Sequence, residues 1–151
     1  MNYRDISPSE ISIIEELWNR NKEYHIQIEK VFKELYTSIT FEKRMKAILE
    51  KENPLKITIA EEDDKIYGYC ISQKEGDVGE VVSLHVLDGQ RGKGVGKELT
   101  VQHIDWLKEN NCKEIGLYVA AGNDKTIKFY EQLGLCSKLT YMQLKPEAID
   151  E

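Results

Sequence analysis

The feature that most constrains this chain is a β-type segment that runs directly into a glycine-rich turn and then into a long helical pattern. Residues 82–87 are rich in β-branched and apolar side chains, which favours a strand. Gly92, Gly94 and Gly96 follow at alternate positions. Apolar residues then recur at helical spacing as far as Asn110. The fold must therefore bring a strand end, a tight turn and a helix start to one point.

This turn predicts an anion-binding site. Glycine lets the backbone approach a ligand closely, and a helix start directs unpaired N–H groups and the positive end of the helix dipole at the same place. Arg91, Lys93 and Lys97 add positive charge beside it. We therefore predict that the turn binds a phosphate or pyrophosphate group. Turn glycines flanked by solvated cations are the plain alternative for the loop taken alone.

Two common nucleotide motifs do not fit the turn. A P-loop needs Ser or Thr directly after Gly-Lys, but Gly96-Lys97 is followed by Glu98. A dinucleotide-binding Gly-x-Gly-x-x-Gly pattern that starts at Gly92 would need a third glycine where Lys97 stands. The ligand phosphate is therefore expected to belong to another kind of molecule.

The period of the apolar residues changes along the chain and indicates the fold class. The first third is mostly helical, with a capping box at Ser7-Pro8-Ser9-Glu10 and Thr40 as a later N-cap. From Lys56 onward, β-rich runs and helices alternate. The predicted elements are a hairpin of 57–59 and 66–71, strands over 80–86, 115–119 and 139–144, and helices over 94–110 and 124–133. We predict a mixed α/β fold with a largely antiparallel sheet flanked by helices, running strand-helix-strand-helix-strand in the C-terminal half.

Composition excludes several classes of protein. A chain of 151 residues has the size of one domain, and we expect a single domain over residues 1–151. The 21 Lys and Arg against 27 Asp and Glu argue against binding to nucleic acid. The longest apolar stretches are too short for a membrane span, and the first residues do not resemble a signal peptide. Three cysteines without Cys-x-x-Cys spacing and scattered histidines suggest no disulfide framework and no metal site, so we expect a cytoplasmic protein.

Two motifs together resemble the GNAT superfamily of acyl-CoA N-acyltransferases. Arg91-x-x-Gly94-x-Gly96 looks like the pyrophosphate-binding signature of that family, at the expected strand-to-helix junction. About thirty residues later, Asn123 and the segment Phe129-Tyr130-Glu131-Gln132-Leu133-Gly134-Leu135 resemble the segment after its fifth strand. The resemblance covers roughly residues 56–144. It departs at Asp88-Gly89, where a Pro-Glu pair is common.

The resemblance implies acetyl-CoA as the acyl-donor cosubstrate, with no metal. The backbone of Leu84 and Val86, beside a strand bulge, would pair with the pantetheine amides. A strand that separates from its neighbour exposes edge N–H and C=O groups that suit this role. Asn123 would face the coenzyme, although a helix N-cap is an equal alternative for it. The N–H groups that would hold the pyrophosphate belong to Arg91, Gly92, Lys93, Gly94, Val95 and Gly96.

The resemblance also assigns two catalytic residues. Tyr130 matches the general acid that protonates the departing thiolate, although core packing is the alternative because Ile127, Tyr130 and Leu133 share a helical face. Glu80 resembles the glutamate that many members use as a base, often through water, and a solvated carboxylate at a strand end is the alternative. His85 should face the other side of the sheet from Leu84 and Val86 unless the bulge changes the alternation, and it is a candidate for the lining of the acceptor pocket.

We therefore predict an acetyltransferase in which a primary amine attacks acetyl-CoA directly in a ternary complex. A non-catalytic acyl-CoA-binding regulatory module and an unrelated phosphate-binding domain are the rival functions. Acidic residues of the N-terminal helices predict a cationic small-molecule or peptide amine as the acceptor, unless they form only a solvated face. These residues are Glu15, Glu16, Glu23, Glu29 and Glu34. Neither nucleic acid nor a membrane is an expected partner, and a homodimer is an open alternative.

Overall fold

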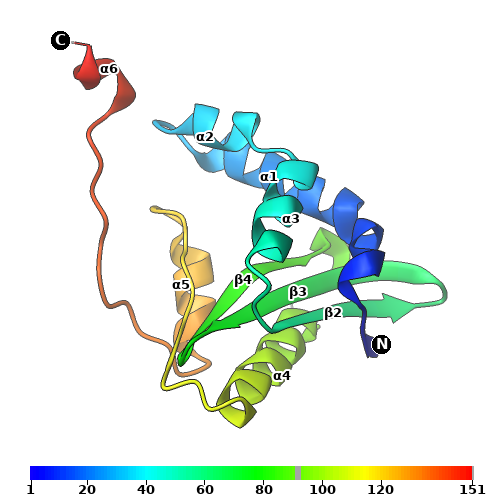
Figure 1. The fold of residues 1–151 in the computed structure, drawn as a ribbon. Helices are drawn as coiled ribbons and strands as arrows, with labels where there is room; N and C mark the ends of the chain where they lie inside the picture. The colour runs from blue at the N-terminus through cyan, green and yellow to red at the C-terminus, as the bar shows by residue number, and fades with distance from the viewer. Residues whose placement is uncertain (91–92, 151) are drawn as a thin grey trace.

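The computed structural model describes residues 1–90 and 93–150, and its centre is one five-stranded sheet (Figure 1). The strands lie in the order β1-β2-β3-β4-β5. Neighbours are antiparallel except β4 and β5, which are parallel. Their bounds are β1 Asn2–Asp5, β2 Leu55–Glu62, β3 Lys65–Glu75, β4 Val78–Val86 and β5 Glu114–Gly116. The mixed α/β class with a largely antiparallel sheet is thereby confirmed.

Helices cover both faces of this sheet (Figure 1). The N-terminal helices lie over one face, here called the α1 face, and α4 lies over the other, the α4 face. The helical elements are η1 Pro8–Ile14, α1 Glu15–Ile28, α2 Lys33–Ser38, α3 Phe41–Glu50, η2 Asp88–Gln90, α4 Val95–Glu109, α5 Asp124–Glu131 and α6 Pro146–Ile149. The predicted caps are present: Ser7 and Glu10 form the capping box, and the Thr40 side chain accepts from the Lys43 N–H at 3.2 Å.

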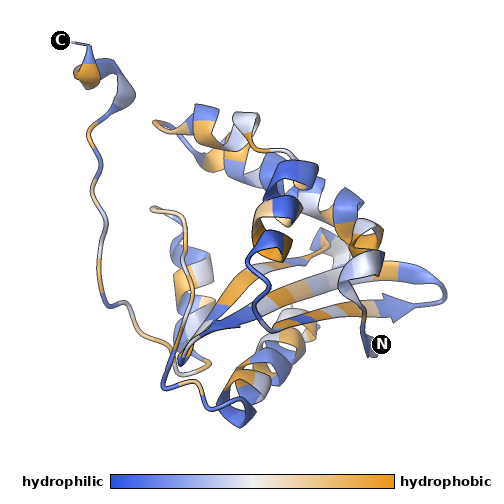
Figure 2. Ribbon diagram, viewed as in Figure 1, coloured by the Kyte–Doolittle hydropathy of each residue, from blue (hydrophilic) through white to orange (hydrophobic). Residues whose placement is uncertain are grey.

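The sheet separates two apolar cores, because side chains alternate between its two faces along each strand. On the α1 face, Ile57, Ile59 and Tyr69 pack with Trp18 and Phe41 of the N-terminal helices. The core of the α4 face is built from buried residues of β2, β3, β4 and α4, namely Ala60, Cys70, Val81, Val86, Val95, Leu99 and Leu107. The sheet is thus buried on both sides, and orange segments line both faces in Figure 2.

Strand β4 contains a bulge at Val82. Its register with β3 passes from Ile71↔Ser83 directly to Ser72↔Val81, so Val82 has no partner in β3. Val81 packs into the core of the α4 face, whereas Val82 packs against the core of the α1 face. The Ser83 hydroxyl lies 2.8 Å from the hydroxyl of Tyr69, which also belongs to the α1 face. Two successive residues of β4 therefore face the same side, and the alternation restarts beyond them.

A buried polar chain crosses the core of the α4 face. His103 of α4 is fully buried, with Nδ1 2.7 Å from Ser72 Oγ and Nε2 2.8 Å from Thr58 Oγ1. The Thr58 hydroxyl donates to Asp5 Oδ1 at 2.6 Å, and the ammonium of Lys56 donates to Asp5 Oδ2 at 2.8 Å. Because Thr58 donates to Asp5, its oxygen accepts from Nε2–H of His103. Burial lowers the pKa of His103, so the ring is neutral at neutral pH and Nδ1 accepts from the Ser72 hydroxyl.

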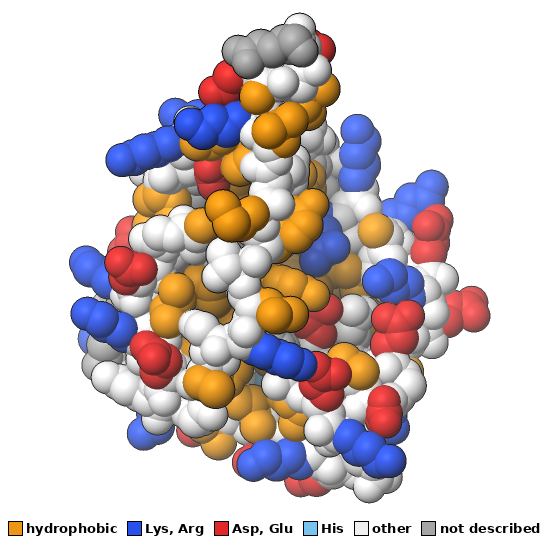
Figure 3. Space-filling view, turned by 90° about the vertical axis from the view of Figure 1, so that its left-hand side faces the viewer, with side chains coloured by type: hydrophobic (Ala, Val, Ile, Leu, Met, Phe, Trp, Pro, Cys, Tyr) orange, Lys and Arg blue, Asp and Glu red, His pale blue; other side chains and the backbone are white. Residues whose placement is uncertain are grey.

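Residues 139–149, the projecting segment, leave the body of the molecule (Figures 1 and 3). The strand predicted over 139–144 is wrong for this structure, in which these residues join no sheet. Leu139, Tyr141 and Met142 are 85–88% exposed. Their pattern suits a strand, but the chain that the structure describes offers them no partner.

Other expectations differ only in extent. The predicted hairpin is present as β2 and β3, and the predicted helix over 94–110 is α4. The strand expected over 115–119 is shorter, because only Glu114–Gly116 pair with β4. The sequence analysis missed β1, a short polar strand that pairs with the edge of β2. Among the described residues, no helix combines the length and the apolar character that a membrane span requires.

Candidate active site

The sheet opens where the sequence predicts the coenzyme. Strands β4 and β5 pair only over Val78–Glu80 and Glu114–Gly116, so from Val81 onward β4 has no ladder with β5. The Leu87 N–H donates to the Tyr67 carbonyl of β3 at 2.8 Å. Peptide groups alternate between the two edges of a strand, and those of Leu84 and Val86 therefore face the β5 side. This is the edge on which the predicted pantetheine contacts depend.

Helix α4 begins beside this opening. Its N-cap is Gly94, with a φ of 82° that favours glycine. Glycine has no side chain that could accept from the first N–H groups of the helix, so Val95, Gly96 and Lys97 lack the usual cap. A Cβ placed on Gly94 would meet no described protein atom within 4 Å. Lys93 is exposed next to it, and the predicted contacts of Arg91 and Gly92 lie outside the described residues.

Helix α5 closes the other side of the opening. A Cβ at Gly96 would lie 3.5 Å from Phe129 Cζ and 3.6 Å from Val86 Cγ2, so α4, α5 and the end of β4 meet at this point. Asn123 is buried at the N-cap position of α5, but its side chain makes no cap hydrogen bond. The alternative prediction that Asn123 is the N-cap of the helix starting at Asp124 is therefore confirmed in position, without a side-chain cap hydrogen bond.

Tyr130 is buried on α5, and its ring packs edge-on against Phe129 with centroids 5.0 Å apart. Burial, with a smaller contribution from Cys70, raises the pKa of the Tyr130 phenol well above its ordinary value. The phenol therefore keeps its proton at neutral pH. This burial fits the packing role as well as the acid role, so the assignment of Tyr130 stays a prediction.

The bulge in β4 places Glu80 and His85 on the same face of the sheet. Gln73, the partner of Glu80 on β3, neighbours Ser72, whose side chain is directed to the α4 face. Alternation therefore directs Glu80 to the α1 face. Without the bulge, Glu80 would share a face with Leu84 and Val86. His85 is buried and lines a cavity on the α1 face, opposite to Leu84 and Val86 on the α4 face, as the sequence analysis expected.

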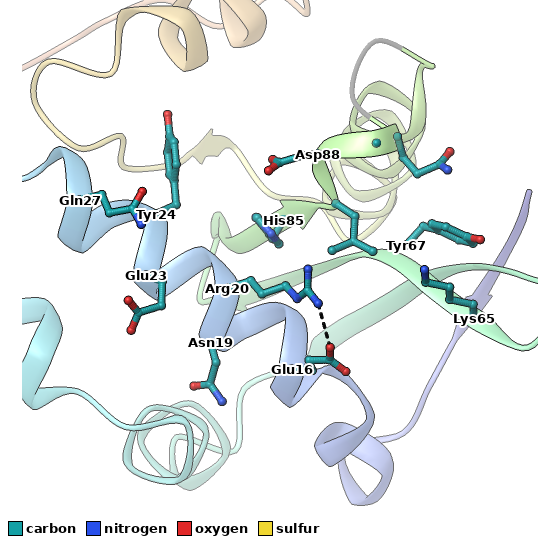
Figure 4. Close-up of a pocket in the computed structure, with 13 residues that line it drawn as sticks. Glu16, Asn19, Arg20, Glu23, Tyr24, Gln27, Lys65, Tyr67, His85 and Asp88 are labelled. Carbon is teal, nitrogen blue, oxygen red and sulfur yellow. Dashed lines mark hydrogen bonds and ion pairs between the residues drawn. The ribbon is translucent and has the colours of Figure 1, made fainter.

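This cavity has a volume of about 710 Å³ and lies between α1 and the ends of β3 and β4. Figure 4 shows Arg20, Tyr24 and Gln27 of α1 on one side, with His85 and Asp88 opposite. The full lining is Glu16, Asn19, Arg20, Glu23, Tyr24, Gln27, Lys65, Tyr67, His85, Leu87, Asp88, Gly89 and Gln90. Glu80 lies on the same face but does not line the cavity. The cavity thus begins where β4 ends.

The acidic helix residues divide into different environments. Glu16 and Glu23 line the cavity, and the Glu16 carboxylate accepts from Arg20 at 3.1 Å. The Glu29 carboxylate instead accepts from the N–H groups of Val31 and Phe32 at 3.0 Å each, which lowers the pKa of Glu29. Glu29 is therefore a turn-stabilising residue and does not line the cavity.

Sequence reasoning missed part of the cavity. Tyr24 lines the cavity together with Gln27 one turn later, and neither residue was a candidate in the sequence analysis. Lys65 and Tyr67 at the start of β3 complete the wall, and the Lys65 ammonium lies 5.2 Å from the centre of the Tyr67 ring. Helical spacing identifies the buried stripe of α1 but gives no sign of which neighbouring positions face a cavity.

Comparisons with known sequences agree with this geometry. The model of the acetyltransferase (GNAT) family matches residues 14–135. Mycothiol acetyltransferase of Streptomyces avermitilis is 31% identical over 99 residues, covering 64% of this chain and 32% of that protein. The protein of the same name from Renibacterium salmoninarum is 39% identical over 57 residues, covering 38% of this chain and 17% of that protein. The chain thus spans about a third or less of the length of these relatives.

Solved structures share the fold. The PaiA N-acetyltransferase of Thermoplasma acidophilum, in complex with coenzyme A, gives a TM-score of 0.76 at 20% identity and covers 93% of this chain and 92% of that chain. The aminoglycoside 6'-N-acetyltransferase AAC(6')-Ig of Acinetobacter haemolyticus gives 0.67 at 20% identity, covering 96% of this chain and 99% of that chain. The opened sheet, the glycine-capped helix and α5 meet where the family motifs predict. Because the family model also matches more than half of the sequence, the chain belongs to the acetyltransferase (GNAT) family.

Proposed function

We propose that this chain transfers the acetyl group of acetyl-CoA to a primary amine of a small molecule or peptide by direct attack in a ternary complex. The observation that carries the proposal is the opening between β4 and β5 beyond Glu80, with the glycine-capped start of α4 beside it. An open strand edge and a helix start offer amide partners and an anion site in one continuous groove.

In this proposal the peptide groups of Leu84 and Val86 pair with the pantetheine amides. The pyrophosphate lies against the N–H groups at the start of α4, near Gly94, Val95 and Gly96. Asn123 is buried at the N-cap position of α5, and its side chain makes no capping hydrogen bond. In the proposal this side chain faces the coenzyme. The PaiA structure was solved in complex with coenzyme A, and its shared fold supports the same kind of ligand here.

Two residues handle protons. The amine nitrogen forms its bond to the thioester carbon while the carbon–sulfur bond breaks. Glu80 takes up the proton that the amine loses, through water, because its side chain lies on the cavity face but outside the cavity lining. Tyr130, which is held protonated by burial, donates to the thiolate.

The acceptor is proposed to be cationic and to bind in the cavity beside α1. Glu16, Glu23 and Asp88 line it, against Arg20 and Lys65 of opposite charge. Glu16 is occupied by Arg20, whereas the Glu23 carboxylate has no partner among the described side chains and is the best placed for an ammonium group. Mycothiol acetyltransferases and an aminoglycoside 6'-N-acetyltransferase are among the similar proteins, which supports a small-molecule amine.

The test is thiol release from acetyl-CoA with a panel of amines. An enzyme releases coenzyme A thiol only when an accepted amine is present, and coenzyme A but not ATP competes for the site. Binding of acetyl-CoA without thiol release across small amines, polyamines, aminoglycosides and peptide amines would favour the non-catalytic acyl-CoA-binding module. Displacement by ATP would favour an unrelated phosphate-binding domain.

A further inference from the structure

Gln73 carries a buried polar atom that the fold leaves without a partner. The residue lies on β3 and is only 7% exposed, and its Oε1 atom makes no hydrogen bond with the described residues. A buried carbonyl oxygen without a donor costs free energy, and native proteins retain few such atoms. An apolar residue of similar size would avoid this cost, so the amide points to a role other than stability.

The sheet places Gln73 directly beside Glu80. The two residues are partners in the register of β3 and β4, which lie side by side in Figure 1, and both side chains lie on the α1 face. The Cβ atoms of such a pair are about 4.5–5.5 Å apart. Glu80 is half-buried, and its carboxylate has no hydrogen-bond or ion-pair partner among the described side chains. Two acceptors of hydrogen bonds therefore lie next to each other on this face, and the described residues offer neither a donor.

A water molecule has the hydrogen-bonding groups that both acceptors need. It can donate one O–H to Gln73 Oε1 and the other to the Glu80 carboxylate. Its lone pairs then remain available to a donor that approaches from the site. An amide oxygen accepts hydrogen bonds but does not act as a base at neutral pH. Gln73 can therefore orient this water, whereas Glu80 alone can take up a proton from it.

We propose that Gln73 is a positioning residue for the proton transfer from the acceptor amine to Glu80. The inference rests on the proposed function, in which Glu80 takes up this proton through water. The lone pair of the amine forms the bond to the thioester carbon, and the nitrogen then carries a positive charge. The water accepts a proton from this nitrogen and passes one of its own to Glu80, which becomes a neutral carboxylic acid. Nitrogen and carboxylate both end without charge, and the water is unchanged.

The test compares pH profiles of kcat for one accepted amine. Gln73→Met removes the amide and keeps the length of the side chain. Its kcat should fall about 10-fold below the pKa of the amine, a part of the 10²–10⁴-fold that a positioned base contributes, and should recover toward high pH. Adding Gln73→Met to Glu80→Gln should cause little further loss, because both residues act on the same water. The melting temperature of Gln73→Met should not fall, since the variant loses an atom that has no partner.

Asn53→Leu is the matched control. Asn53 Nδ2 is also buried without a partner among the described residues, but Asn53 leads into β2, on the other side of Gln73 from Glu80. Strands β2 and β4 are about 10 Å apart, so this variant should keep the pH profile of the wild type.

The outcomes separate this inference from the function on which it rests. If Glu80→Gln changes the pH profile and Gln73→Met does not, the positioning role is overturned and the base role of Glu80 stands. Losses that multiply in the double variant, or an equal loss in Asn53→Leu, indicate a structural effect and also overturn the positioning role. A wild type that releases no thiol with any amine refutes the proposed function and this inference with it.

Discussion

The buried polar chain through His103 makes the stability of this protein depend on pH. The dependence extends to pH values higher than those at which carboxylates titrate. Burial, with a smaller contribution from the Lys56 ammonium, lowers the pKa of His103 to about 3, and Asp5 only partly opposes this. In the unfolded chain the same ring has a pKa of about 6.5. Between these values the unfolded state binds the extra proton, so stability is complete above pH 6.5 and is lost as the pH falls.

The size of the effect follows from the difference in proton binding. A pH of 5 is about 1.5 units below the pKa of the ring in the unfolded chain, while the ring in the folded protein is still neutral. The free energy of unfolding is therefore about 2 kcal/mol lower at pH 5 than at pH 8. Protonation inside the fold is unfavourable for a structural reason as well: Nδ1 accepts from the Ser72 hydroxyl, which would have to reverse. A loss of this size is a large fraction of the stability of a typical domain.

The assay is urea unfolding followed by tryptophan fluorescence between pH 5 and pH 8, since Trp18 is buried in the core. His103→Gln removes the titrating group. The variant will be less stable than the wild type at every pH, because a buried hydrogen-bonded ring is lost. Between pH 5 and pH 8, however, its free energy of unfolding should change by about 2 kcal/mol less than that of the wild type. His25→Gln is the control: burial also lowers the pKa of His25, yet that side chain is only half-buried, so most of the slope should survive. Equal slopes in wild type and His103→Gln would refute the reasoning.

The remaining predictions concern the proposed reaction. Gly94→Val should abolish binding of acetyl-CoA in calorimetry, whereas Gly76→Val, which imposes similar strain at a φ of 63° in the β3–β4 turn, should not; equal affinities in the two folded variants would contradict the anion site. Tyr130→Phe should lower kcat by about 10²–10⁴-fold with nearly unchanged affinity for acetyl-CoA, and an unchanged rate would leave Tyr130 as a core residue. Glu80→Gln should depress the rate most below the pKa of the amine and recover at high pH, so a pH profile identical to wild type would exclude the base role. Glu23→Gln should raise KM for cationic acceptors about 2- to 5-fold and weaken the salt dependence of kcat/KM, and a salt-insensitive wild type would argue against electrostatic attraction.

Local signals predicted the strand, the turn and α4 well. A β-rich run, alternating glycines and a helical period all act within a few residues, so the junction near Gly94 could be located from the sequence. The resemblance to the family assigned Leu84, Val86, Asn123 and Tyr130 to one site. Their roles in binding and catalysis stay predictions.

Features that depend on pairing could not be predicted. Strand β1 is four polar residues long, and only the edge of β2 makes it a strand. The bulge at Val82 appears only when β4 is aligned with β3, so the sequence alone did not indicate that Glu80 and His85 share a face. The segment 139–144 has the residues of a strand, but strand formation needs a partner edge, which the sequence of one chain does not specify.

The bulge at Val82 also determines how insertions and deletions act on this protein. Val82 is the extra residue of the bulge, so its deletion would leave Ser83 opposite Ile71 and Val81 opposite Ser72, and β4 would alternate regularly. Glu80 would keep its place opposite Gln73 and stay on the face that carries His85. A deletion at any position from 83 to 86 would instead shift the residues before it by one place unless the bulge were lost with it. A one-residue gap at Val82 in an alignment is therefore compatible with the same placement of the carboxylate.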